Sequence, residues 1–146
     1  YSYIDTAMWL FDDTPQVVFA RAGSIKHKYE DFATIMLGFK DNKVAIISSN
    51  WITPTRVRNF NAVCTEGIIS ADFISQGIRI ETDKDTEIPR NEKQEPLLLE
   101  IQNFLGAIEG KNELRVKPEQ AVNVTKIAEA SLLSSQKGTP IYLELQ

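Results

Sequence analysis

VAIISSNWITPTRVRNF, residues 44–60, is the stretch around which the rest of the chain is organised. Its first residues are apolar and mostly β-branched, a composition typical of a buried strand. The stretch then turns polar, and a proline, which has no N–H to donate to a sheet, follows shortly after. The polar end contains Asn50, Trp51, Arg56 and Arg58. A strand that leaves the core and ends in such residues is typical of the rim of a pocket. The alternative is a strand, a turn and a solvated basic patch.

Length and composition place the chain among ordinary soluble proteins of one domain. It has 146 residues, of which 42% are hydrophobic and 25% charged. The net charge of -4 argues against a nucleic-acid partner, because such binding needs a basic surface. No apolar run approaches the roughly 20 residues that span a bilayer, and no secretory leader is visible. We therefore expect no membrane contacts, and the single cysteine fits a reducing, cytoplasmic setting.

The sequence contains few residues or motifs that could carry out catalysis or bind a metal or nucleotide. Cys64 is the single cysteine and is expected to be a buried, inert thiol, and His27 is the single histidine and is expected in an exposed turn. No spacing of metal ligands occurs, so no metal site is expected. The chain also lacks the G-x-G-x-x-G and P-loop patterns that hold nucleotides. It therefore has no self-contained catalytic apparatus.

The hydrophobic periodicity predicts strands followed by helices. Helices are expected over residues 2–12, 93–109 and 118–136. Strands are expected over residues 16–22, 31–39, 44–48, 58–64, 68–74, 78–82 and 141–145, with a charged loop over residues 83–92. This order predicts an α+β fold with a mostly antiparallel open sheet and helices packed on one face. Apolar residues also populate the other face, so a second sheet or another subunit should cover it.

Motifs near both ends of the chain resemble one family. EIQNFLGAIEG (100–110), VKPEQA (116–121) and IAEASLLSSQKG (127–138) resemble successive segments at the end of the Gfo/Idh/MocA oxidoreductases. SYIDTAMWL (2–10) is similar to the H-D-I-D-x-x-x-W-L helix of that family. The resemblance extends over essentially the whole chain.

This resemblance implies a role as one part of an NAD(P)-dependent dehydrogenase. Residues 1–146 would form a single substrate-binding and oligomerisation domain. The N-terminal Rossmann domain, which binds NAD or NADP in this family, is expected to be absent from this chain. The chain alone is therefore expected to bind no cofactor and to be inactive. Its implied partners are its own Rossmann domain, a sugar or nucleotide-sugar substrate, and further copies of the chain bound through the open sheet face.

The N-terminal helix motif departs from the family at one position. Ser2 replaces the family histidine that acts near the substrate hydroxyl during hydride transfer. Asp5 matches the family aspartate, and Tyr3 stands where a second acid is common. The histidine role cannot be transferred to Ser2. The resemblance implies Asp5 as a catalytic residue, and Tyr3 is a candidate for the proton transfer. The alternative for Asp5 is a carboxylate that stabilises the helix through its dipole.

NWITPTRVR, residues 50–58, resembles a subgroup of that family, the UDP-N-acetylglucosamine 3-dehydrogenases. There Trp51 could stack on a sugar or base, Arg56 or Arg58 could bind a diphosphate, and Asn50 offers a donor and an acceptor to sugar hydroxyls. If the strand is regular there, alternation puts both arginines on one face. Three alternatives stay open. The arginines could simply pair with acidic residues, the substrate could be a free polyol such as myo-inositol, or the domain could be a non-catalytic oligomerisation or binding module.

Overall fold

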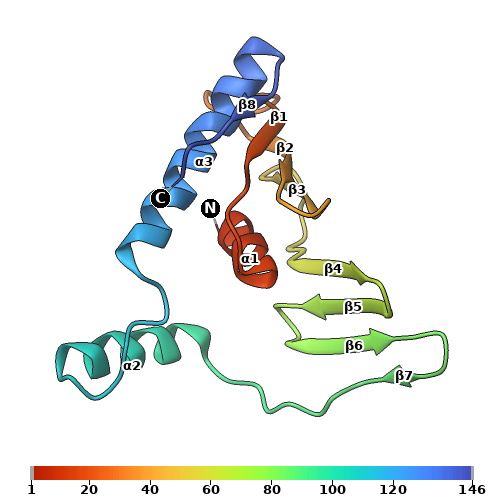
Figure 1. Cartoon of the computed structure of the whole chain (residues 1–146), viewed down its shortest axis with the longest axis vertical. Coiled ribbons are helices and arrows are strands. Elements are labelled where there is room, and N and C mark those ends of the chain that lie inside the picture. The colour runs from red at the N-terminus through yellow and green to blue at the C-terminus, as the bar shows by residue number, and fades with distance from the viewer. Residues whose placement is uncertain (1, 146) are drawn as a thin grey trace. The chain divides into compact units, whose positions relative to one another are not determined.

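The computed structural model describes residues 2–145, which fall into two compact units. One unit comprises Tyr1–Thr53 and Arg115–Gln146, and the other comprises Pro54–Leu114. The first contains α1 (Ser2–Phe11), β1 (Val17–Gly23), β2 (Phe32–Gly38), β3 (Val44–Asn50), α3 (Pro118–Lys137) and β8 (Ile141–Tyr142). The second contains β4 (Asn59–Cys64), β5 (Gly67–Asp72), β6 (Gly77–Glu81), β7 (Thr86–Glu87) and α2 (Pro96–Ile108). Figure 1 labels these elements.

The sheet of the first unit has the strand order β3-β2-β1-β8, and all its pairs are antiparallel. The predicted hairpin of β2 and β3 is confirmed, with Phe32 opposite Asn50 at its open end. Asp41 and Asn42 close it with φ angles of 56° and 58°. Asp and Asn tolerate this left-handed conformation, which gives a tight turn the twist that a hairpin needs.

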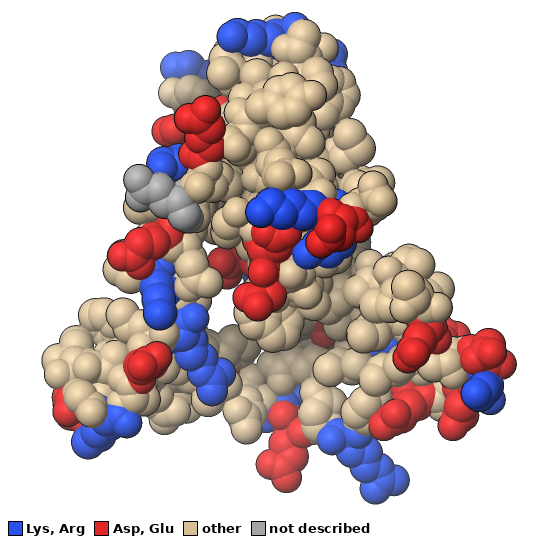
Figure 2. All heavy atoms as spheres, viewed as in Figure 1, with Lys and Arg blue, Asp and Glu red and all other residues tan. Residues whose placement is uncertain are grey.

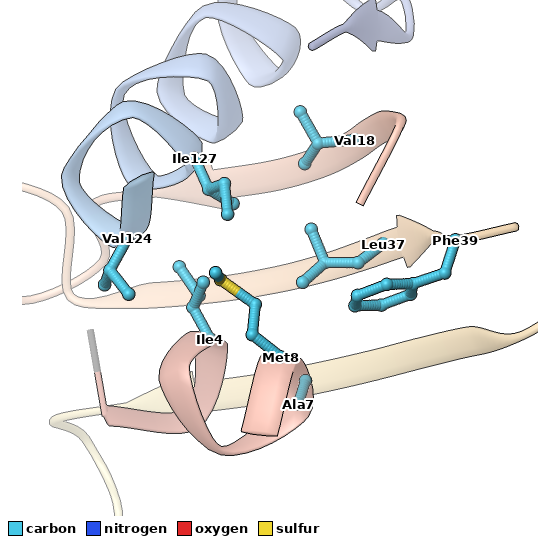
Figure 3. Packing of buried hydrophobic residues seen from close by; sticks show 8 residues of the cluster. All are labelled: Ile4, Ala7, Met8, Val18, Leu37, Phe39, Val124 and Ile127. Carbon is cyan, nitrogen blue, oxygen red and sulfur yellow. The ribbon is translucent and has the colours of Figure 1, made fainter. Parts of the chain in front are cut away.

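Helices α1 and α3 bury their apolar stripes against one face of this sheet. The cluster shown in Figure 3 combines side chains from α1, β1, β2, the residue after β2, and α3. Its members are Ile4, Ala7, Met8, Val18, Leu37, Phe39, Val124 and Ile127. The alternation of the strands and the helical spacing of the stripes bring these residues together. The predicted α+β class with helices on one face is confirmed in this unit.

The edge strand β8 is shorter than the predicted strand over residues 141–145. It pairs only with Val17 and Val18 of β1, so the rest of that edge of β1 needs other partners. Two serines of α3 supply them. The N–H of Ala20 donates to Ser134 Oγ at 3.0 Å, and the N–H of Ala22 donates to Ser135 Oγ at 2.8 Å. Helix α3 thus covers the sheet and also replaces part of its last strand.

The other face of this sheet is apolar and exposed. Phe19 of β1 lies opposite Met36 of β2, which lies opposite Ile46 of β3, so one apolar row crosses three strands. Ile46 is 74% exposed. A shallow hollow of about 270 Å³ on this face is lined by Val17, Phe19, Met36, Gly38, Val44, Pro140 and Tyr142. Within the first unit, no helix among the described residues covers this row.

The second unit has its own antiparallel sheet, with the order β4-β5-β6-β7. The sequence predicted one sheet, but the strands divide between two because residues 51–58 are not a strand and β3 pairs only with β2. Strand β7 lies in the predicted loop over residues 83–92. Cys64 is exposed, so the expectation of a buried thiol was wrong. It is the last residue of a strand, where the open sheet gives it no cover.

Helix α2 begins at Pro96, as expected for a proline in the first turn. The segment before it is tied to the turn between β5 and β6, because Gln76 Nε2 donates to Gln94 O at 2.8 Å and the N–H of Gln94 donates to Gln76 Oε1 at 3.0 Å. None of the residues of α2 is buried, although its sequence is apolar. The helix follows the predicted pattern, but its stripe has no partner surface in this unit.

On the face shown in Figure 2, acidic and basic side chains are interspersed among the described residues, and the basic ones form no continuous surface. No described helix is both long and apolar enough to cross a membrane.

Candidate functional site

Asn50 ends β3 and shapes the turn that follows. Its Oδ1 accepts hydrogen bonds from the N–H of Ile52 at 3.0 Å, the N–H of Thr53 at 2.9 Å and the Thr53 hydroxyl at 2.9 Å. The Oδ1 atom of Asn50, which was expected to accept a hydrogen bond from a sugar hydroxyl, therefore already accepts hydrogen bonds within the turn. Only the amide nitrogen of Asn50 can serve as a donor to a ligand, so its binding role stays a prediction in this reduced form.

Trp51 is the most exposed of the tryptophan side chains, at 82%. Its backbone is nevertheless fixed, because its N–H donates to Asp31 O at 2.8 Å. This bond extends the pairing of β3 with the start of β2. A fixed backbone and an open indole face are what a stacking surface requires, so the structure leaves the predicted role of Trp51 physically available.

Asp31 holds the loop over residues 24–30 in place. Its side chain is almost fully buried and accepts hydrogen bonds from the backbone N–H groups of Ile25 (2.9 and 3.1 Å), Lys26 (2.6 Å) and His27 (3.0 Å). Burial alone raises the pKa of the Asp31 carboxyl, but hydrogen bonds to the carboxylate, that of Lys26 first among them, lower the pKa from 3.8 to about 2. Asp31 is therefore ionised at neutral pH.

His27 lies between Asp31 and Trp51. Its Nδ1 is 3.2 Å from Asp31 Oδ2. Its ring is edge-on to the indole of Trp51, with ring centroids 6.5 Å apart and planes at 72°. The imidazole is about half exposed, as expected of a turn, but the sequence did not predict these two partners. The available signal was an aspartate directly after a polar loop, since such carboxylates often bond nearby backbone N–H groups.

Arg56 and Arg58 lie in the second unit, in the segment before β4. Both are exposed, and neither takes part in an ion pair with any residue from 2 to 145. The expected strand over residues 58–64 begins instead at Asn59. The two arginines are not part of the strand, so the condition under which strand alternation would put both on one face is not met. Their role in binding a diphosphate stays a prediction.

Tyr3 and Asp5 lie in the first turn of α1, and both are partly buried. Ser2 is exposed, and its carbonyl accepts the hydroxyl of Thr6 at 2.8 Å. The far end of α1 is fixed at the start of β3, where Lys43 Nζ lies 3.4 Å from Phe11 O. Trp51 follows the other end of β3, so a seven-residue strand of about 20 Å separates these anchor points. The catalytic roles of Tyr3 and Asp5 stay predictions.

The described residues offer no obvious place for a metal or a dinucleotide. Between residues 2 and 145, no group of three or more His, Cys, Asp or Glu side chains could hold a metal ion. A dinucleotide is held by a glycine-rich loop between a parallel strand and a helix. Both sheets of this structure are antiparallel and the sequence has no such loop, so these residues do not fit the group.

Residues 3–70 match the model of the GFO/IDH/MocA C-terminal domain, in agreement with the resemblance of the N-terminal helix motif and of the 50–58 motif. No curated protein matches the chain. Among solved structures, a putative oxidoreductase from Thermotoga maritima has a TM-score of 0.85 at 19% identity, and the match covers 97% of this chain and 44% of that one. The UDP-N-acetylglucosamine 3-dehydrogenase from Acidithiobacillus ferrooxidans gives 0.85 at 19% identity, covering 92% and 45%.

A third structure is an oxidoreductase from Agrobacterium radiobacter in complex with NAD+, L-tartaric acid and magnesium. Its TM-score is 0.76 at 17% identity, and the match covers 95% of this chain and 46% of that one. At these identities the likenesses show the fold alone. The chain spans less than half the length of each of these three proteins.

Proposed function

Because residues 3–70 match the GFO/IDH/MocA C-terminal domain, we propose that the chain is the substrate-binding and oligomerisation part of an NAD(P)-dependent sugar or nucleotide-sugar dehydrogenase. That match is the observation that carries the proposal. It includes α1, with Tyr3 and Asp5, and the residues of the 50–58 motif. The complete enzyme would remove a hydride from a sugar carbon and a proton from its hydroxyl.

The favoured substrate is of the UDP-N-acetylglucosamine type. The 50–58 motif supports it, and so does the likeness in fold to a dehydrogenase of that sugar. The side chains of the motif have suitable chemistry, because Trp51 offers an exposed indole for a ring, and Arg56 and Arg58 offer guanidinium groups for a diphosphate. A free polyol such as myo-inositol would use the indole but leave the arginines without a ligand.

The nicotinamide belongs in a separate domain. When bound there, it accepts the hydride, while this chain binds and orients the sugar. The likeness to a structure that contains NAD+ supports the cofactor class. Since residues 2–145 do not fit a dinucleotide, we expect the chain alone to give no turnover. Reduction of NAD by the isolated chain would contradict the proposal that the cofactor binds in a separate domain.

A second candidate is a non-catalytic oligomerisation domain, favoured by the replacement of the family histidine by Ser2 and by the exposed apolar sheet face. In the dehydrogenase, Asp5 or Tyr3 takes over the proton transfer. Mutating either residue should then lower kcat while leaving substrate affinity within a few-fold. A full-length protein with no turnover on any sugar would favour the second candidate.

Titration calorimetry on the full-length protein tests the substrate class. We expect UDP-N-acetylglucosamine to bind and myo-inositol to bind far more weakly. Substitution of Arg58 by Gln should raise the Kd for the nucleotide sugar by roughly tenfold, because a charged hydrogen bond is lost. Good turnover of a free polyol with no binding of any nucleotide sugar would contradict the proposed substrate.

A further inference from the structure

We propose that the loop over residues 24–30 and Trp51 form a sugar-binding subsite, in which His27 Nε2 accepts a hydrogen bond from a ring hydroxyl and the indole stacks on the ring. The subsite rests on the proposed function, because it names the part of the site that would hold the sugar. It adds His27, a residue outside all the family motifs, to the binding residues.

The loop is fixed before any ligand arrives. The buried carboxylate of Asp31 accepts hydrogen bonds from the consecutive backbone N–H groups of residues 25–27. The backbone that carries His27 cannot move without breaking these bonds. A further bond runs from the N–H of Asp31 to Gly23 O at 2.9 Å. Preorganisation of this kind reduces the entropy lost on binding.

The hydrogen-bond pattern determines which nitrogen of His27 faces a ligand. An ionised carboxylate only accepts hydrogen bonds, so the Nδ1 atom that lies 3.2 Å from Asp31 must carry the hydrogen. In the neutral imidazole, Nε2 then has a free lone pair. No hydrogen bond from residues 2–145 occupies that atom in the structure. Nε2 is therefore an oriented acceptor suited to a hydroxyl donor.

Trp51, the residue after β3, completes the subsite. Its backbone bond to Asp31 and the edge-on contact of its ring with His27 place the indole beside the loop within one compact unit. The exposed indole can cover the apolar C–H face of a sugar ring, while the imidazole bonds a hydroxyl at its rim. An aromatic surface with one directed polar group matches a sugar better than it matches a purely charged ligand.

Two substitutions of His27 separate a ligand contact from a structural one. In His27→Asn the amide nitrogen replaces Nδ1 and keeps the bond to Asp31 but removes Nε2. In His27→Gln the longer amide reaches the position of Nε2 and weakens the bond to Asp31. In the full-length protein, we expect the Asn variant to raise the Kd for UDP-N-acetylglucosamine about tenfold and the Gln variant less than about threefold. Equal losses, or a larger loss for Gln, would overturn the role of Nε2.

Matched tryptophan variants test the stacking surface. Trp51→Leu should raise the same Kd about tenfold, whereas Trp9→Leu, at an exposed tryptophan in α1, should leave it within about twofold. UDP alone should bind the His27 and Trp51 variants as it binds the wild type. An equal loss for UDP would assign the loop to the nucleotide and overturn the sugar subsite. If the wild type binds no sugar, the proposed function itself is wrong. If the wild type binds UDP-N-acetylglucosamine and the His27 and Trp51 variants bind it with the same Kd, only the subsite is wrong.

Discussion

Asp31 makes the loop over residues 24–30 depend on one ionised carboxylate. The backbone donors around it stabilise the charged form, which is why its folded pKa of about 2 lies below the ordinary 3.8. A depressed carboxyl pKa contributes stability that is present above the unfolded pKa and is lost as pH falls through the folded one. We therefore expect the urea midpoint to fall between about pH 4 and pH 2, in part through protonation of Asp31.

Asp31→Asn should lower the urea midpoint at pH 7 and remove this part of the pH dependence. The amide keeps the shape of the carboxylate, but its NH2 group faces backbone donors instead of accepting from them. Asp41→Asn is the matched control, because the same chemical change falls on an exposed turn residue whose left-handed φ suits asparagine. An Asp31→Asn variant with the wild-type midpoint at pH 7 would contradict the structural role of Asp31.

Helix α3 is attached to β1 through the hydroxyl of Ser134 as well as through its apolar stripe. Ser134 is fully buried, accepts from the N–H of Ala20 and donates to Thr139 O at 2.7 Å. Ser134→Ala leaves that buried N–H without its partner, so we expect it to lower the free energy of unfolding by about 1–3 kcal/mol. The measurement is urea denaturation at pH 7.

Ser131 provides the control for this prediction on the same helix. It is also buried, but its hydroxyl donates only to Ile127 O, the carbonyl one turn earlier in α3. Ser131→Ala should therefore change the unfolding free energy by less than about 1 kcal/mol, since alanine is also the better helix former. Equal losses for the two variants would show that the bond of Ser134 to β1 contributes little.

The sequence predicts elements better than the contacts between them. The helices and most strands follow from periodicity, which is local, and Gly138 ends α3 with a left-handed φ of 66°, as expected of a capping glycine. The division into two sheets, the short β8 and the serines that complete β1 depend on residues far apart in the chain. The contact of His27 with Asp31 is local, but its contact with Trp51 joins two loops that only strand pairing brings together.

At the scale of the whole molecule, the residues of the 50–58 motif belong to different compact units. Asn50 and Trp51 belong to the first unit, and Arg56 and Arg58 to the second. The boundary falls within the 50–58 motif, between Thr53 and Pro54, so the two halves of the motif are carried by different units.

In the proposed oligomer, the exposed face of the β3-β2-β1-β8 sheet is the interface. Ile46 lies at the end of the row that crosses Met36, and a second copy of the chain would bury it. Ile46→Glu would bury an unpaired charge in that interface but cost little in a monomer, so light scattering should show a lower mass with an unchanged unfolding midpoint. Val63→Glu, at an 80% exposed residue of β4, should keep the wild-type mass. A monomeric wild type, or an Ile46→Glu variant of unchanged mass, would exclude this face as the interface.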